Sequence, residues 1–436
     1  MRELQKGWAK SGDRVQKEIY YRLPALKSRN FRLYVVGQVF SLSGTFMTQI
    51  AVPWLIYDLT KSAWLLGLAG FLGFLPTLVL TPFSGVLSDR WNRQDLLKLV
   101  QILGICVSGT LTLLTFAGWI NYWILLGLSV LAGLLKGLDM PIRHAFVVEM
   151  VENRADLGNA IALNSAMLSS SRLIGPAMGG ILIASVGVEY CFLYDSLSYL
   201  AAIAALAAMK MVRKPIQPQT QSTWQKLKEG FDYVCNTLPI RSILLLLAIQ
   251  GLFGISYMAV LPVFAADVLK SGADTFGFLS ASGAIGSVLA CVYLSLRRGI
   301  EGLERVIALC PALIGLGLIA FACSRNVWLS IVILTVVGGS GTLQVSCSNA
   351  VIQNLVEDDK RGRVMSFYAL ALIGMLPLSN LFAGTLTQAI GAPDALIVCG
   401  ILCIVGSVNF VRHLPQLSRW IARAEHLSGD LPTTSS

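Results

Sequence analysis

Four charged side chains stand inside otherwise apolar stretches of this chain. Lys136, Asp139 and Arg143 are spaced i, i+3, i+7, so they share one face of a helix. Arg172 stands halfway along a later apolar stretch. A charge at mid-bilayer costs about 2.5–3.5 kcal/mol unless it meets water or a partner, so these residues indicate a functional site. Asp139 is our candidate for a carboxylate that takes up and releases a proton, because burial raises a carboxylate's pKa toward neutrality.

Two interpretations of the Asp139 cluster stay open. In the first, Lys136 and Asp139 neutralise each other on the helix, and Asp139 serves proton coupling. In the second, Asp139 and Arg143 lie near the cytoplasmic end of the helix and join Arg93 in a structural charge network. The depth of Asp139 in the membrane distinguishes the two.

A short charged turn, residues 84–93, separates two long apolar runs. A turn this short makes the flanking helices antiparallel neighbours. Gly85 lacks a Cβ, so another backbone can approach it closely. Asp89 is able to cap the N-terminus of a neighbouring helix. Arg90 and Arg93 are expected at the water boundary.

This turn resembles the loop between helices 2 and 3 of the major facilitator superfamily. The match lies at Gly85, Asp89, Arg90 and Arg93. Asn92 stands where that family usually has glycine, and Asn tolerates a positive φ better than other side chains. Residues 357–366 resemble the family's loop before helix 11, which implies that Arg361 and Arg363 belong to the same gate and that its helix N-terminus docks Asp89.

Residues 172–180 read Arg-Leu-Ile-Gly-Pro-Ala-Met-Gly-Gly. Proline frees a backbone carbonyl and bends the helix, while glycines let a partner helix come close. The segment resembles the Gly-Pro-x-x-Gly-Gly element of proton-coupled exporters in the superfamily, with its members at Gly175, Pro176, Gly179 and Gly180. The resemblance implies a pivot, including Arg172, that seals one side of a cavity. An ordinary seam of small residues is the alternative, and the two are compatible.

Several polar and aromatic residues are candidates for lining a substrate cavity, because most lie in spans whose family counterparts line one. They are Gln49, Trp54, Asn164, Tyr257, Gln344 and Asn349. Lone polar groups in such spans form interhelical hydrogen bonds as often as substrate contacts. Five aspartates are expected at outer span boundaries: Asp58, Asp195, Asp267, Asp274 and Asp394. Of these only Asp195 is a candidate for reaching inward.

The elements that must position these residues are membrane spans. The chain is 55% hydrophobic and 13% charged, against about 25% charged residues in soluble domains. Runs of about twenty apolar residues predict an all-α membrane protein with twelve transmembrane helices. We place them at 33–57, 63–87, 95–118, 122–148, 159–186, 190–212, 241–266, 275–296, 305–323, 328–353, 364–390 and 395–412.

The basic residues set the expected orientation. Of 34 Lys and Arg residues, 29 fall on the side of both termini and three on the other. Because cytoplasmic loops are enriched in basic residues, both termini are expected in the cytoplasm and the protein in the plasma (inner) membrane. The net charge of +10 follows this topology, so we do not expect nucleic-acid binding.

An internal repeat predicts two pseudo-symmetric six-helix bundles. Gly180 and Gly187 recur at an offset of 204 as Gly384 and Gly391, close to half the chain. The expected organisation is a basic tail (1–32), a first bundle (33–212), a cytoplasmic linker (213–240), a second bundle (241–414) and a tail (415–436).

Enzymatic functions are not expected. The chain has three histidines and nine cysteines, without metal-ligand spacing, nucleophile elbow or phosphate-binding loop. We therefore expect no cofactor and no metal. Active transport would draw on an ion or substrate gradient.

A wider pattern narrows the resemblance. Residues 30–32, the Asp139-x-Pro141-x-Arg143 segment and residues 159–165, with 172–180, look like the branch that holds enterobactin exporters and macrolide efflux proteins. This implies a monomer in the bilayer that exports a small organic molecule, siderophore- or drug-like, by alternating access against proton influx. Two alternatives remain: a facilitator or importer of the same fold, and a non-transporting membrane scaffold or sensor.

Overall fold

The computed structural model describes residues 23–151, 154–209, 231–297, 299, 302–412 and 414, and, within them, all side chains except those of 81–90, 154, 358 and 359. This part of the chain is helical and contains no β-strand. Twelve of its helices are long and apolar enough to cross a membrane. The all-α, twelve-span prediction is confirmed. Most of both predicted tails, and residues 213–230 of the predicted linker, lie outside the described residues.

The first bundle consists of six helices joined by short loops. They are α2 (Arg29–Thr60), α3 (Ala63–Arg90), α4 (Arg93–Phe116), α5 (Tyr122–Met150), α6 (Leu157–Ser185) and α7 (Glu189–Ala208). Polar side chains start three of them: Ser28, Asn92 and Asn121 each accept hydrogen bonds from backbone N–H groups of the first turn, groups that a helix itself leaves without partners.

The second bundle has two interrupted spans. Its elements are α9 (Leu238–Ile249), η3 (Gln250–Gly254), α10 (Tyr257–Val263), η4 (Phe264–Val268), α11 (Ala273–Leu296), α12 (Leu303–Cys323), α13 (Val327–Leu355), α14 (Asp358–Ile373), α15 (Met375–Ile390) and α16 (Ala392–Val411). The seventh span, predicted as one helix, contains two π-helical turns. The eleventh breaks at Gly374, because Pro377 has no N–H for the carbonyl of Ile373.

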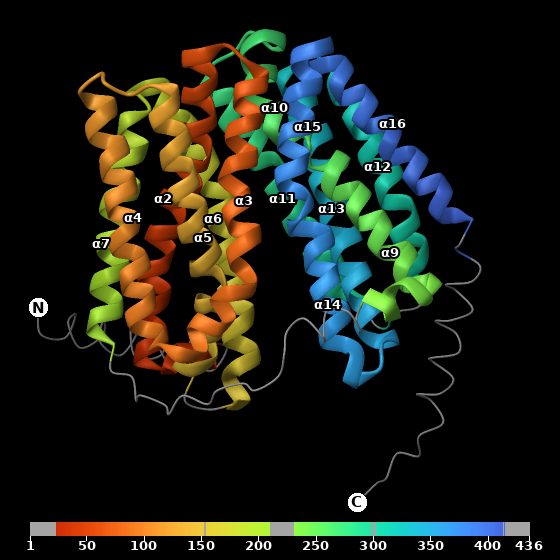
Figure 1. The fold of residues 1–436 in the computed structure, drawn as a ribbon, viewed down its shortest axis with the longest axis horizontal. Helices are drawn as coiled ribbons and strands as arrows, with labels where there is room; N and C mark the ends of the chain where they lie inside the picture. The colour runs from red at the N-terminus through yellow and green to blue at the C-terminus, as the bar shows by residue number, and fades with distance from the viewer. Residues whose placement is uncertain are drawn as a thin grey trace, which may run out of the picture.

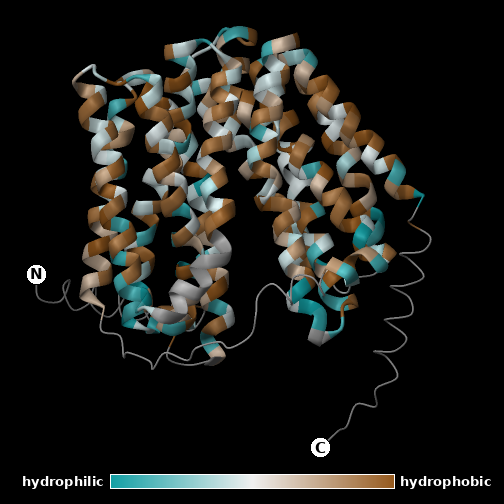
Figure 2. Cartoon of the chain, viewed as in Figure 1, coloured by the Kyte–Doolittle hydropathy of each residue, from teal (hydrophilic) through white to brown (hydrophobic). Residues whose placement is uncertain are grey.

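The two bundles stand side by side (Figure 1). They meet at the end where α2 turns into α3, which we name the far end. They diverge toward the end where α7 finishes and α14 begins, which we name the linker end. Hydrophilic residues gather at both ends, and the helices between them are mostly hydrophobic (Figure 2). That distribution is what a bilayer requires of spanning helices.

The predicted repeat has a structural counterpart in helices α6 and α15. Gly187 follows the end of α6 with a φ of +117°, and Gly391 caps α15 with a φ of +87°. Such values favour glycine, because a Cβ is strained there. The two glycines therefore end equivalent helices of the two bundles.

The predicted turn at residues 84–93 is wrong in its extent. Helix α3 runs on to Arg90 and α4 begins at Arg93, so only Trp91 and Asn92 link them. Asn92 has a φ of −66° and accepts hydrogen bonds from the backbone N–H groups of Gln94 and Asp95. It serves as an N-cap in an extended conformation, and the tolerance of Asn for positive φ is not used.

Candidate functional site

Two glycine pairs join the bundles near the far end. A Cβ on Gly67 of α3 would lie 2.7 Å from the Cα of Gly384 in α15, and a Cβ on Gly180 of α6 would lie 2.8 Å from the Cα of Gly277 in α11. Each would also lie 2.6 Å from a carbonyl oxygen of the partner helix. Side chains do not fit at such distances, so the backbones themselves are in contact. We name these two pairs the seam.

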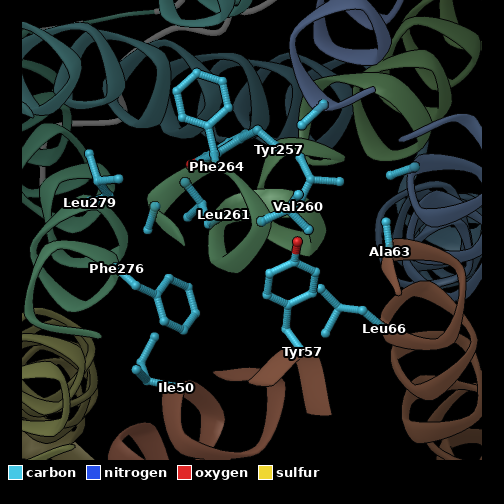
Figure 3. Close-up of a cluster of buried hydrophobic side chains, with 14 of the residues drawn as sticks. Ile50, Tyr57, Ala63, Leu66, Tyr257, Val260, Leu261, Phe264, Phe276 and Leu279 are labelled. Carbon is cyan, nitrogen blue, oxygen red and sulfur yellow. The ribbon is translucent and has the colours of Figure 1, made fainter. Parts of the chain in front are cut away.

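Side chains complete the junction beside the seam. The Tyr57 hydroxyl donates a hydrogen bond to Asp267 of η4, and Ser62 Oγ donates to Gln388 Oε1 over 3.2 Å. The Trp54 ring stacks on Phe276 of α11, with ring centroids 6.1 Å apart. Figure 3 shows the buried cluster at this junction, in which Tyr57 of α2 points toward Val260 of α10. The first and second bundles are thus tied together by α2, α3 and α6 on one side.

The segment 172–180 contacts both bundles. Within its own bundle, a Cβ on Gly175 would lie 2.5 Å from Phe46 Cβ, and one on Gly179 would lie 3.2 Å from Met47 Cα. Toward the other bundle, the Pro176 carbonyl oxygen would lie 2.6 Å from a Cβ on Gly277. The small residues of this segment therefore do pack closely against neighbouring helices, as the alternative interpretation expected. Gly175 and Gly179 make these contacts within the first bundle, and Gly180 makes its contact with the second bundle.

Asp139 is held by Arg143 and not by Lys136. Asp139 Oδ2 accepts hydrogen bonds from Arg143 Nε at 2.9 Å and Nη2 at 2.6 Å, and Asp139 Oδ1 accepts one from Gln101 Nε2 at 3.4 Å. Lys136 Nζ instead lies 4.9 Å from the centroid of the Phe74 ring. Asp139 is 11 residues from Met150, the last residue of α5, or about 16 Å along the helix. The predicted neutralisation of Asp139 by Lys136 is therefore wrong.

The linker end carries a second ion pair, which joins α4 to α5. Arg93 Nη1 lies 2.6 Å from Glu149 Oε1, and both side chains are about three-quarters buried. Arg361 donates to the Val356 carbonyl over 3.4 Å, and Arg363 lies in the second turn of α14. Gly85, Asp89 and Arg90 belong to the last turns of α3, and their side chains lie outside the described residues.

The six predicted cavity residues lie in different surroundings. Asn164 is buried and accepts a hydrogen bond from the Tyr34 hydroxyl at 3.1 Å, and Gln344 is buried and donates to the Leu246 carbonyl over 3.5 Å. These two hold helices together, as the alternative interpretation expected. Asn349 accepts a hydrogen bond from Gln353. Trp54 and Tyr257 lie at the junction of the bundles, and Gln49 is exposed.

Asp195 is a buried carboxylate that the sequence placed at a boundary. Its side chain is 3% exposed and lies between α7 and α2. Thr48 Oγ1 donates to Asp195 Oδ2 at 3.0 Å, while Oδ1 has no hydrogen-bond partner. Within the described chain no cation lies at ion-pair distance from Asp195. The sequence signal for this burial was the position of Asp195 as the seventh residue of α7. The prediction placed Asp195 too close to the outer boundary of the span.

A polar path leads from the neighbourhood of Asp195 toward the linker end inside the first bundle. The Tyr199 hydroxyl lies 3.4 Å from Thr45 Oγ1, one turn before Thr48. Thr45 Oγ1 donates to the Ser41 carbonyl, and Ser41 Oγ donates to Gln101 Oε1 over 3.4 Å. Gln101 then reaches Asp139. Hydroxyl and amide groups therefore lie along the bundle between the two carboxylates, although these hydrogen bonds do not form one unbroken chain.

A groove lies apart from this site. Its volume is about 620 Å³, and it runs between the start of α2 and the end of α7. It is lined by Arg29, Arg32, Leu33, Val36, Gly37, Phe40, Ala201, Ala204, Ala205 and Ala208. None of these residues belongs to the seam or to the charged groups described above, so the groove is not part of the candidate site.

Known proteins similar to this chain are transporters. Residues 22–431 match the family described as transmembrane secretion effector. The staphyloferrin A transporter of Staphylococcus aureus is 24% identical, over 86% of this chain and 94% of that protein. Macrolide efflux protein A of Streptococcus pyogenes is 20% identical, over 87% and 95%.

Among solved structures, a bacterial homologue of the human lysosomal transporter Spinster, in an inward-facing and unoccupied conformation, superposes with a TM-score of 0.66 at 14% identity, covering 91% of this chain and 99% of that one. This likeness concerns the fold. It agrees with the twelve spans and two bundles described above. The proteins that this chain matches are transporters and not enzymes, and the chain belongs to the transmembrane secretion effector family of the major facilitator superfamily.

Proposed function

We propose that this protein is a secondary active exporter that moves a small organic molecule out of the cell by alternating access, in exchange for protons. The seam is the observation that carries the proposal. Two equivalent backbone contacts hold the far end together, while the bundles diverge toward the linker end. Alternating access needs two repeats that rock against each other about a central site. At the two glycine pairs the backbones touch without side chains between them, and such contacts can separate without side chains having to disengage there.

The distribution of basic residues supports the proposed direction of transport, from the cytoplasm outward. With 29 of 34 basic residues on the side of the termini, the linker end faces the cytoplasm in our proposal. The arrangement described is then the one that receives substrate from inside the cell. Closing the linker end and opening the seam would release it outside.

Two carboxylates are candidates for proton coupling, and the contacts favour Asp195. The charge of Asp139 is compensated by two hydrogen bonds from Arg143. Asp195 faces hydroxyl groups and is almost fully buried. An uncompensated charge inside a membrane protein is costly, so a change of protonation at Asp195 would alter the energy of the surrounding helices most. We place Asp139 second, with Lys136 and Arg143 as its charged neighbours.

The gate at the linker end is proposed for the opposite conformation. When the bundles close there, Asp89 would dock at the N-terminus of α14, with Gly85 allowing the approach and Arg90, Arg93, Arg361 and Arg363 forming the charged lock. Asp89→Ala should then raise the labelling rate of a cysteine introduced at the cytoplasmic side. An unchanged labelling rate would remove Asp89 from the lock.

The substrates named for two relatives support the proposed class of substrate. One relative is a staphyloferrin A transporter and another a macrolide efflux protein. We therefore propose a siderophore-like or drug-like molecule, bound where Trp54, Tyr257, Gln49 and Asn349 are candidates for contact.

The test begins with cells that lack the protein. A compound that accumulates inside them, identified by mass spectrometry, would be offered to everted membrane vesicles with and without an imposed proton gradient. We expect accumulation that requires the gradient. Equilibration without the gradient would indicate a facilitator, and absence of flux would indicate a scaffold or sensor; either result contradicts proton-driven export.

A further inference from the structure

We infer that the substrate of the proposed exporter is an organic anion whose negative charge is recognised by Lys136 and Arg172. The inference rests on the proposed function, because it names the class of molecule that this transport path accepts. It starts from two cations of the first bundle that have no acidic partner among the described residues.

Both cations contact aromatic rings. Lys136 Nζ lies 4.9 Å from the centroid of Phe74, and the Arg172 guanidinium lies 5.8 Å from the centroid of Phe46. Both side chains are exposed, although each stands well inside a spanning helix. Asp139, which lies one helical turn from Lys136 on α5, pairs with Arg143 instead.

The two side chains lie just beyond the seam, on its linker side. Phe74, under Lys136, follows Gly70 by one helical turn, and Gly70 is in contact with Asn380 of α15. Arg172 precedes Pro176 by one turn, and the Pro176 carbonyl contacts the backbone at Gly277 of α11. Both cations therefore stand within about two helical turns of interbundle contacts, on the side toward the linker end.

The two positive charges come from different helices, α5 and α6, and are close enough to repel each other. An anion bound between them would relieve that repulsion and compensate both charges. A guanidinium binds a carboxylate through two parallel hydrogen bonds, and the ammonium adds a second donor group. The rings of Phe46 and Phe74 offer apolar walls for the carbon skeleton. A cationic molecule would meet like charge at this level, so the same pair excludes it.

Binding of two dyes with one ring system and opposite charge tests this inference. Purified full-length protein in detergent would be titrated with carboxyfluorescein, an anion, and with rhodamine 6G, a cation, and followed by fluorescence anisotropy. We expect tighter binding of carboxyfluorescein. Lys136→Gln and Arg172→Gln should each weaken it by roughly ten- to hundredfold, the range for a hydrogen bond to a charged group.

Matched variants control for folding. Lys136→Arg keeps the charge and should retain binding of the anion, while Lys98→Gln removes a cation at the linker end of α4 and should leave it unchanged. Rhodamine 6G bound as tightly as carboxyfluorescein by the wild-type protein, binding of neither dye, or an anion affinity unchanged in both Gln variants would overturn the inference.

Transport separates this inference from the proposed function. In proteoliposomes, gradient-driven movement of rhodamine 6G and not of carboxyfluorescein would support an exporter and overturn the anion assignment. Preferential binding of carboxyfluorescein with no gradient-driven movement of any tested compound would support the anion assignment and contradict the exporter.

Discussion

The described spans of the first bundle keep five Asp, Lys and Arg side chains away from the helix ends: Lys136, Asp139, Arg143, Arg172 and Asp195. In the described spans of the second bundle, Asp, Glu, Lys and Arg stay near the helix ends, and the interior is polar through neutral groups such as Gln250 and Gln344. Yet the bundles contribute equally to the seam, one glycine to each pair. In the proposed exporter, mechanical closure would be shared by the bundles, whereas we propose that charge recognition and proton coupling belong to the first bundle.

The largest expected effect comes from removing the uncompensated acid. Asp195→Asn should keep the fold, because the amide still accepts the hydrogen bond from Thr48, but it should reduce gradient-driven export by roughly 5–150-fold, the usual range of coupling between sites. Export by everted vesicles with and without a proton gradient measures this. Asp58→Asn, an exposed acid at the far end, is the control. Full gradient dependence in Asp195→Asn would break the assignment of coupling to this residue.

The next effect tests the symmetry of the seam. Gly277→Ala and Gly384→Ala each place a Cβ less than 3 Å from partner backbone, so each should disfavour the closed far end by about 1–3 kcal/mol, the usual cost of overpacking. Faster maleimide labelling of Thr387→Cys, a buried position on α15, in a background without reactive native cysteines, measures the opening.

Gly127→Ala is the matched control, since nothing lies within 4 Å of a Cβ there. Similar effects of the two seam variants would support the view that the two glycine pairs contribute equally to closing the far end. An effect confined to one variant would contradict it.

A smaller effect is expected at the ion pair of α5. Asp139→Asn replaces a charged acceptor of Arg143 in a partly exposed site, so it should lower stability by about 1 kcal/mol and leave gradient-driven export largely intact. Thermal unfolding in detergent and vesicle transport report the two quantities. Loss of gradient dependence in Asp139→Asn but not in Asp195→Asn would assign proton coupling to Asp139 instead of Asp195.

The smallest effect belongs to the second bundle. Gln344 is fully buried, its Oε1 has no partner and its Nε2 makes one long hydrogen bond. Gln344→Leu should change stability by less than about 1 kcal/mol and leave the export rate unchanged, because losing a weakly paired polar group is nearly neutral. A strong loss of transport at normal stability would show that Gln344 itself contacts substrate.

The amino-acid sequence determined the twelve spans, the family resemblance and the repeat of Gly180 and Gly187 at Gly384 and Gly391. Span signals are local, because about twenty consecutive apolar residues are enough to cross a bilayer. The sequence also singled out Lys136 and Arg172, since a charge within a span is conspicuous in any apolar run.

Only the tertiary structure decided what those residues meet. Spacing of i, i+3 and i+4 made both Lys136 and Arg143 available to Asp139, and the rotation of α5 against α2, α3 and α4 selected Arg143. The burial of Asp195 and the pairing of Gly67 with Gly384 depend on how helices from distant parts of the chain come together. The backbone hydrogen bonds of a helix join residues that are close in the sequence, so a helix can be predicted from its local sequence. Which residues a side chain contacts depends on the other helices that pack around it.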